Sequence, residues 1–294
     1  MRLKTVIDLL RPFTLLAPLI VSCCIMIASY EYTERSDLSF STLGFTILFA
    51  SFSLALLNGA SNALNQATDI REDRLSKPFR PIPRGSLTSR DACIIASLLY
   101  VTAFILAVCV HVLFLLLISL ITVFTITYSI SPRMKQYLFF NQLWVAIPRG
   151  LLGILASWSV FGNPFQPVPL AIGSIAALFL FGGTTTKDVL DADADKQTGI
   201  HTLVNVCGIT KTAYIAGLCM TSAFLLILPL VYLQVLDLYL LPLIMLVVLA
   251  ASIAWMMTHD HHTERHENTR SWRLMYATYF IFALGFAILT ISFS

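Results

Sequence analysis

The sequence predicts an all-α membrane protein, a bundle of nine transmembrane helices in two four-helix halves plus a ninth helix. Of its 294 residues, 57% are hydrophobic and only 12% are charged. Soluble domains average about a quarter charged residues. The mean hydropathy is +0.80. Nine apolar segments are each long enough to cross a bilayer, which takes about 20 residues.

The nine apolar segments and the connections between them make up nearly the whole chain. No Gly/Ser linker or low-complexity tract divides the chain, so residues 1–294 are predicted to form one domain. Two of the segments nearly meet at His111, and we expect two helices there because about 40 residues are too long for one crossing. The segments span residues 12–30, 42–64, 91–111, 112–130, 138–161, 168–187, 210–234, 237–258 and 273–293.

The basic residues predict the orientation. With the N-terminus inside, all of the 19 Lys and Arg residues except Arg35 and Arg149 fall on the inside. Cytoplasmic loops carry such an excess of positive charge. We therefore expect a multi-pass protein of the cytoplasmic membrane, with its N-terminus and its active site on the cytoplasmic side.

A polar line follows the second apolar segment. If that helix continues, Asn58, Asn62, Asn65, Asp69 and Asp73 share one face, because their spacings are four, three, four and four. Polar groups at that depth are costly unless they face the bundle interior. Carboxylates one turn apart repel each other, and oxygen ligands of this kind suit Mg²⁺. The alternative is an ordinary solvated helix end.

The stretch "KPFRPIPRG", residues 77–85, comes next. Its three prolines exclude a helix and favour a stiff extended segment. Lys77, Arg80 and Arg84 lie on this segment, and we expect such cations to contact a phosphate-rich ligand. Asn62, Arg80 and Arg84 are predicted to bind substrate.

A second acidic helix end follows the sixth segment. Asp188, Asp191 and Asp195 are spaced three and four, so they share a face, whereas Asp193 is expected to face solvent. Gly199 ends the helix. An EF-hand calcium loop is not favoured, because the glutamate at its twelfth position is missing and the stretch follows directly from an apolar segment.

Two facing carboxylate clusters can hold metal ions that bridge a diphosphate, a good leaving group once cations withdraw charge from it. An allylic carbocation left behind needs a dry, aromatic surrounding. The chain supplies 20 Phe, 10 Tyr and 4 Trp. A polyprenyl diphosphate could enter from the membrane lipids, and no feature indicates nucleic acid as a partner.

These residues resemble a known family. The motifs NxxxDxxxD (Asn65 to Asp73), RPIPxG (Arg80 to Gly85), YSISPRMK (Tyr128 to Lys135) and KDxxDxxxDxxxGxxTL (Lys187 to Leu203) resemble the UbiA superfamily of intramembrane prenyltransferases. The resemblance implies Mg²⁺-dependent transfer of a prenyl group, with a geranylgeranyl-type donor favoured. Its usual proline after the Thr-Leu pair is Val204 here.

The resemblance also implies roles for individual residues. Asn65, Asp69 and Asp73 would bind one edge of the metal–diphosphate unit, and Asp191 and Asp195 the other, with help from Asp188. Tyr128 would face the reacting carbon, and Arg80, Lys135 and Lys187 would neighbour the diphosphate. The residues implied as catalytic are Asp69, Asp73, Asp191, Asp195 and Tyr128.

The acceptor is open between two classes, geranylgeranylglyceryl phosphate of the archaeal type and an aromatic quinone or chlorophyll precursor. Arg149 lies 11 residues into the fifth segment, about 16 Å deep at 1.5 Å per residue. It could bind a carboxylate or phosphate of the acceptor, or pair within the protein. Arg11 is a second candidate, and its alternative is a snorkelling interfacial arginine.

Other interpretations are open. The same fold could cyclise a prenyl chain without an acceptor. An ion-coupled transporter would need ionisable groups near the midplane of several helices, where only Arg149 lies. The histidine-rich stretch "HDHHTERHENTR", residues 259–270, is expected to be a solvated loop rather than a metal site.

Overall fold

The computed structural model describes residues 3–34, 38–259 and 268–293, and every regular element in these ranges is helical. Arg35 and residues 260–267 of the histidine-rich stretch lie outside the described residues. The first half of the chain contains α1 (Leu3–Leu10), α2 (Pro12–Tyr32), α3 (Phe40–Thr68), α4 (Ile70–Ser76), α5 (Ser89–Val108), α6 (Val112–Ser129) and η1 (Met134–Gln136).

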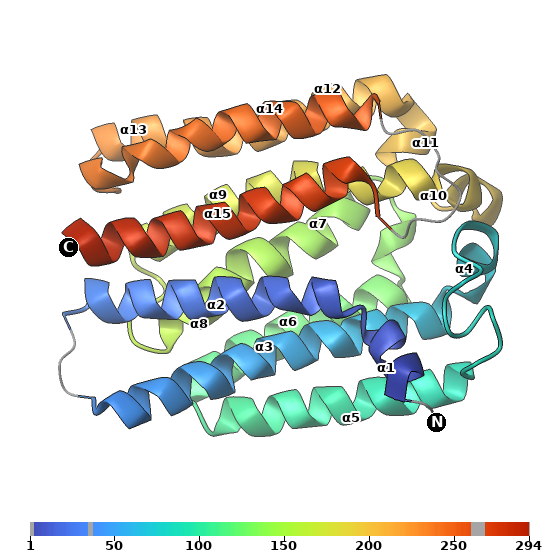
Figure 1. Ribbon diagram of the computed structural model, residues 1–294, viewed down its shortest axis with the longest axis horizontal. Coiled ribbons are helices and arrows are strands. Elements are labelled where there is room, and N and C mark those ends of the chain that lie inside the picture. Colours follow the sequence, from blue (N-terminus) through green and yellow to red (C-terminus); the bar gives the residue numbers. More distant parts are fainter. Residues whose placement is uncertain (1–2, 35–37, 260–267, 294) are drawn as a thin grey trace.

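The second half begins with a helix in three parts, α7 (Phe140–Ala146), a π-helical turn η2 (Ile147–Leu152) and α8 (Gly153–Ser159). It continues with α9 (Pro167–Gly183), α10 (Thr185–Thr198), α11 (Leu203–Cys207), α12 (Ile209–Leu225), α13 (Ile227–Tyr232), η3 (Leu238–Met245), α14 (Leu246–Met257) and α15 (Arg270–Phe293). Figure 1 shows the long helices side by side, with α1, α4, α10 and α11 gathered toward one end of the bundle.

Eight helices of the described chain are long and apolar enough to cross a membrane. The fifth predicted segment is the remaining one, and it forms the run α7–η2–α8, in which Pro148 interrupts regular α-helix. Nine crossings therefore stay a prediction. The two helices expected around His111 are confirmed, because its Nδ1 accepts a hydrogen bond from the Phe114 backbone N–H (3.1 Å) and caps α6.

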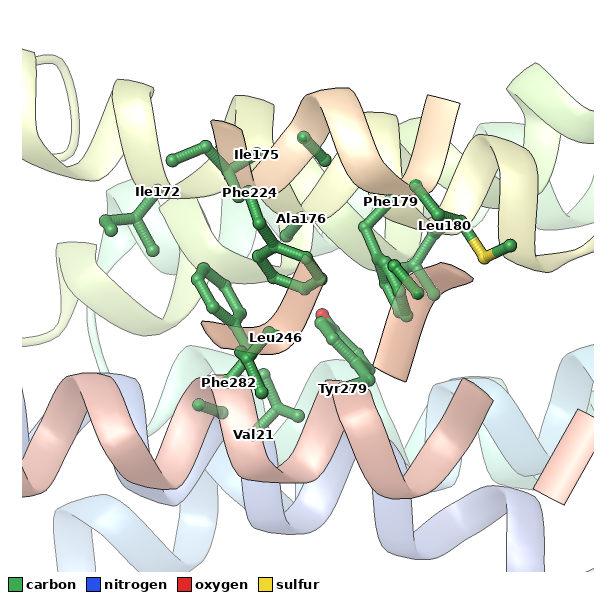
Figure 2. Packing of buried hydrophobic residues seen from close by; sticks show 14 of the residues in the cluster. Val21, Ile172, Ile175, Ala176, Phe179, Leu180, Phe224, Leu246, Tyr279 and Phe282 are labelled. Atoms are coloured by element: carbon green, nitrogen blue, oxygen red, sulfur yellow. The ribbon is translucent and has the colours of Figure 1, made fainter. Parts of the chain in front are cut away.

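The largest cluster of buried side chains joins α2, α9, α12, α14 and α15. Figure 2 shows Phe179, Phe224, Phe282 and Tyr279 converging between these helices. The ring centroids of Phe179 and Phe224 lie 5.2 Å apart. Burial against lipid gives little hydrophobic gain, so close packing supplies the stability of such a bundle. Gly182 illustrates this, since a Cβ there would lie 2.5 Å from the Ala216 carbonyl oxygen of α12.

The chain breaks between α1 and α2 at Arg11, whose φ of 56° lies in the left-handed region. Side chains of α3 satisfy the carbonyls that this break exposes. The Asn62 amide donates to Leu10 O (2.9 Å) and to Thr14 Oγ1 (2.7 Å), and the Gln66 amide donates to Leu9 O (2.6 Å). Asn62 thus has structural partners, a role that the sequence prediction of substrate binding had missed.

The proline-rich segment after α4 is a series of turns, not the extended segment that the sequence predicted. The Arg80 N–H donates to Lys77 O (3.1 Å), and the Arg84 N–H donates to Arg80 O (3.1 Å). The φ angle of proline, near −65°, suits turns as well as extended chain. The predicted end of the second acidic helix is confirmed, because Gly199 follows α10 with φ of 78°.

Candidate active site

Two acidic stripes face each other at one end of the bundle. The first acidic stripe (Asn65, Asp69, Asp73) runs from the end of α3 into α4, and the second acidic stripe (Asp188, Asp191, Asp195) lies on α10. Helices α4 and α10 are in contact, and a polar pocket with about 690 Å³ of empty space, including its opening, lies between the stripes. Its lining includes Glu72, Asn65, Asn141, Arg11, Lys77, Arg80, Lys135, Lys187, Tyr128 and all five aspartates.

Asp69 joins α3 to α4 without losing the helical ladder, because its N–H donates to Asn65 O (3.0 Å). Its carboxylate is buried and is held by cations from the segment around η1. Lys135 pairs with it, and Arg133 donates to both Asp69 Oδ1 (3.0 Å) and Glu72 Oε1 (2.9 Å). Burial raises the pKa of Asp69, but the charges of Lys135 and Arg133 outweigh it and hold the pKa below its usual value.

Asp73 lies one turn further on and is also buried. Its Oδ1 accepts a hydrogen bond from Arg80 (2.7 Å), whereas its buried Oδ2 has no hydrogen-bond partner among the described residues. Burial raises the pKa of Asp73 above its usual value, although Arg80 opposes the shift. When ionised, this buried oxygen has no hydrogen bond to offset its negative charge. It is therefore suited to bind a metal ion.

The second acidic stripe is tied to the first by Lys77, which pairs with Asp191. Burial lowers the pKa of Lys77, and the Asp191 charge opposes this effect. Asp188 accepts hydrogen bonds from the amides of Asn141 (3.4 Å) and Gln142 (3.2 Å) on α7. Asp195 is buried.

Asp193 is exposed, as predicted. Within the described ranges, no three His, Cys, Asp or Glu side chains lie close enough together to form a metal site unaided. Basic side chains separate the carboxylates instead. The oxygens nevertheless fit a hard cation in type, since carboxylates and amides suit Mg²⁺, and Asp73 Oδ2 is available. The metal ligands therefore stay predictions.

An apolar chamber with about 1330 Å³ of empty space, including its opening, adjoins the polar pocket. Four residues line both spaces and mark their junction: Arg11, Asn65, Tyr128 and Lys187. The Lys187 ammonium donates to Tyr128 Oη (2.7 Å), and Tyr128 Oη donates to Asn141 Oδ1 (2.9 Å). Tyr128 therefore has a fixed orientation where a charged head and an apolar tail would meet.

The chamber is lined by helices from both halves of the bundle, α2, α3, α6, α9 and α15, together with α7, η2 and α8. Trp272 and Tyr276 pack closely on its α15 side, with tilted rings whose centroids lie 4.4 Å apart. Arg149 lies in its wall, where its guanidinium donates weakly to Tyr276 Oη (3.4 Å). Such a wall is suited to apolar chains and flat rings.

The structure brings together most of the predicted residues. It does not place Arg84 with them, because this exposed side chain pairs with Asp8 of α1 (3.0 Å) and lines neither space. Gly85, with φ of 76°, turns the chain directly after Arg84.

Sequence reasoning had missed several polar neighbours of the stripes: Glu72, Arg133, Asn141 and Gln142. Arg133 lies two residues before Lys135 in the recognised YSISPRMK segment, which was a usable signal. Nothing in the sequence pattern marked Asn141 or Gln142, because an amide at a helix start has many ordinary uses.

Comparison with known proteins agrees with this geometry. The described fold is that of a membrane-embedded enzyme with a charged pocket at one end of an apolar chamber. A family model for the UbiA prenyltransferase family matches residues 16–281. The chain belongs to that family, and it is an integral multi-pass membrane prenyltransferase.

Individual relatives are similar at a moderate level. The chain is 26% identical over 229 residues to digeranylgeranylglyceryl phosphate synthase of Methanosphaera stadtmanae, covering 77% of each chain. It is 29% identical over 216 residues to a probable homogentisate phytyltransferase 2 of Oryza sativa subsp. japonica, covering 71% of this chain and 56% of that one.

Among solved structures, a UbiA homologue from Archaeoglobus fulgidus bound to DMAPP and Mg²⁺ superposes with a TM-score of 0.73 at 17% identity, covering 99% of this chain and all of that one. A structure of digeranylgeranylglyceryl phosphate synthase superposes with a TM-score of 0.68 at 19% identity and covers 99% of both chains. At these sequence identities, the structural similarity is evidence for the fold alone.

Proposed function

We propose that the protein transfers the prenyl group of a polyprenyl diphosphate, favoured as geranylgeranyl diphosphate, to a lipid-like or aromatic acceptor, with Mg²⁺ as cofactor. The C–O bond to the diphosphate breaks, a bond from the acceptor to the prenyl carbon forms, and the acceptor loses a proton. The Archaeoglobus fulgidus homologue with bound DMAPP and Mg²⁺ supports the donor and the metal by analogy.

The charge balance of the polar pocket is the observation that carries this proposal. Among the described residues, its lining has six carboxylates (Asp69, Glu72, Asp73, Asp188, Asp191, Asp195) and five basic side chains (Arg11, Lys77, Arg80, Lys135, Lys187). Arg133 does not line the pocket but pairs with two of these carboxylates, so a diphosphate alone would meet a surrounding with no net positive charge. Divalent cations supply that positive charge, so the lining suits a diphosphate that arrives together with metal.

The residues divide the work as follows. Asn65, Asp69, Asp73, Asp191 and Asp195, with Asp188, would hold Mg²⁺ between the two acidic stripes. The metal would supply Lewis-acid withdrawal of charge from the diphosphate oxygens.

Lys77, Arg80, Lys135 and Lys187 are positioned to bind the departing diphosphate by charge-assisted hydrogen bonds. The basic side chains now pair with the carboxylates, so substrate binding would exchange these partners rather than expose new charge. Tyr128 would lie beside the reacting carbon, with its ring and hydroxyl fixed by Lys187 and Asn141.

The apolar chamber would hold the prenyl tail and keep water from the allylic carbocation. Its aromatic wall, including Trp272 and Tyr276, offers negatively polarised ring faces to developing positive charge. We further propose that the polar pocket opens to the cytoplasm and that the N-terminus lies there, because the basic residues concentrate at that end.

The experiment is an assay of purified protein with Mg²⁺, labelled geranylgeranyl diphosphate and five acceptors: geranylgeranylglyceryl phosphate, 4-hydroxybenzoate, dihydroxynaphthoate, homogentisate and chlorophyllide. We expect a prenylated acceptor together with released diphosphate, and at least a 100-fold loss in Asp69→Ala and Asp191→Ala, the scale of removing one electrostatic stabiliser. Asp193→Ala, on the exposed side of α10, is the matched control and should retain full activity.

No product with any acceptor, alongside unchanged diphosphate release in both variants, would contradict the proposal. A cyclic hydrocarbon formed without acceptor would instead support the cyclase alternative, which shares the ionisation step.

A further inference from the structure

Arg149 is a basic residue in the wall of the apolar chamber. Among the described residues, no acidic side chain compensates its charge. It lies half-buried in the chamber wall, within a predicted membrane crossing. Its guanidinium contacts Tyr276 Oη at 3.4 Å. Among the described residues, no carboxylate lies within salt-bridge distance of it, whereas Lys77, Arg80 and Lys135 of the polar pocket all pair with aspartates.

The backbone at Arg149 is fixed from two sides. On one side, Gly150 packs against α9 so closely that a Cβ would lie 2.5 Å from Ala177 Cα. On the other side, Tyr279 of α15 donates a hydrogen bond to Arg149 O (3.0 Å). The π-helical turn around Arg149 is of a kind that often marks functional sites. The backbone that carries Arg149 is thus held at the chamber wall by packing that cannot shift without strain.

A guanidinium stays ionised in proteins, and a charge at this depth requires a partner. Tyr276 supplies one polar atom, and the guanidinium has five N–H donors in a planar fork. That fork matches two oxygens of a carboxylate or phosphate. The wall around Arg149 therefore has the properties of a binding site for an oxyanion.

We infer that the acceptor is anionic and that Arg149, with Tyr276, binds its negative group inside the membrane-embedded chamber. This inference rests on the proposed prenyl transfer. An aromatic carboxylate and the phosphate of a glyceryl lipid both offer the required oxyanion. The tilted, closely packed rings of Trp272 and Tyr276 favour the aromatic carboxylate, because a flat ring gains offset or edge contacts beside them.

The location also predicts how the acceptor is oriented. The diphosphate binds at the polar pocket, so the reacting carbon lies at the junction marked by Tyr128 and Lys187. Arg149 lines the chamber but not the polar pocket, so an acceptor held there reaches the junction from within the chamber. Its nucleophilic atom must therefore lie at the end of the molecule away from its anionic group.

The test compares Arg149→Gln, Arg149→Lys and Tyr276→Phe with wild type, and Arg90→Gln, an exposed arginine on α5, is the matched control. Initial rates are measured with 4-hydroxybenzoate, homogentisate, their methyl esters and geranylgeranylglyceryl phosphate. We expect Arg149→Gln to raise the KM for an acid at least about tenfold, the scale of one lost charge-assisted hydrogen bond. The KM for geranylgeranyl diphosphate should stay within about twofold, and Arg149→Lys should recover part of the loss.

The methyl esters separate charge recognition from a structural effect. Wild type should prefer each acid to its ester at least about tenfold, and Arg149→Gln should abolish that preference. Equal losses for acid and ester, or an unchanged KM for the acid, would overturn the inference. The wild-type preference tests it even if Arg149→Gln does not fold.

The remaining outcomes assign the anion or separate the two proposals. If geranylgeranylglyceryl phosphate alone is a substrate and Arg149→Gln raises its KM, the anion site holds and the aromatic assignment is overturned. If wild type prenylates no acceptor, the proposed function fails and this inference fails with it. If wild type transfers the prenyl group and Arg149→Gln equals wild type, only this inference fails.

Discussion

Lys77 and Asp191 form a partly buried ion pair that joins the two acidic stripes across the polar pocket. Lys77 follows α4 and Asp191 belongs to α10, so residues 114 positions apart in the chain meet at one place. A lysine between facing carboxylates relieves their repulsion and lets the stripes approach each other. The same ammonium is a partner for the phosphates of a bound diphosphate.

Replacing Lys77 should therefore weaken donor binding. In Lys77→Gln we expect the KM for geranylgeranyl diphosphate to rise at least about tenfold, since one charge-assisted contact is lost. Inhibition by free diphosphate should weaken in parallel. Lys211→Gln, an exposed lysine of α12, is the control, and an unchanged KM in Lys77→Gln would remove this residue from the donor site.

The two carboxylates of the first acidic stripe should differ in their effect on stability. The folded pKa of Asp69 lies below the reference value of 3.8, so its ionisation stabilises the fold above that value, and the contribution is lost as the pH falls through the folded pKa. The folded pKa of Asp73 lies above 3.8, so its contribution is present below 3.8 and is lost as the pH rises through the folded pKa.

At pH 7, Asp69→Asn should therefore cost about 3 kcal/mol, because it breaks a buried pair and leaves Lys135 uncompensated. Asp73→Asn should cost less than Asp69→Asn, because burial already favours the neutral form of Asp73 and an amide oxygen can still accept the hydrogen bond from Arg80. Thermal unfolding of the detergent-purified variants at pH 7 measures the difference, and Asp73→Asn as the more damaging change would contradict this assignment. Both variants should lose activity.

Gly150 should be intolerant of a methyl group. In Gly150→Ala the new Cβ meets the α9 backbone at 2.5 Å, and such overpacking costs about 1–3 kcal/mol. The shift moves Arg149, so we also expect a higher KM for the acceptor. Gly44→Ala is the matched control, since a Cβ there meets nothing within 4 Å. Equal melting temperatures for the two variants would show that η2 can move away from α9.

Asn62 should behave as a structural residue. Asn62→Ala removes the hydrogen bonds to Leu10 O and Thr14 Oγ1 and should cost about 1–3 kcal/mol by leaving buried groups unsatisfied. The KM for geranylgeranyl diphosphate should change less than about twofold in the surviving protein. A large rise in KM with unchanged stability would restore the predicted contact with substrate.

The sequence allowed the helical membrane fold and the two acidic stripes to be predicted, because both depend on local periodicity. The spacing of Asp188, Asp191 and Asp195 defines one helical face whatever its surroundings. The positions of Asn62 and Arg84 could not be predicted in this way. Asn62 donates to Leu10 O at the break between α1 and α2, and Arg84 pairs with Asp8 of α1, so both contacts join segments far apart in the chain.

The fifth helix shows the same limit. Its length was predicted, and Pro148 marks the place where regular α-helix is interrupted, but the close packing of Gly150 against α9 is a tertiary contact that no single segment reveals. The neighbours of Asp188 depend equally on tertiary contacts, because Asn141 and Gln142 come from a different helix. Recognition of a motif therefore identified the carboxylates and left their hydrogen-bond partners unassigned.

The most direct measurement is a double-mutant cycle of Mg²⁺-dependent prenyl transfer with Asp69→Asn, Asp191→Asn and the combined variant, and with Asp193→Asn as control. If the two acidic stripes bind one metal–diphosphate unit, each single change should lower kcat/KM at least about 100-fold, and the double variant should be no worse than either, since residues that act as a unit are not additive. Independent, multiplying losses, or full activity in either single variant, would contradict the account.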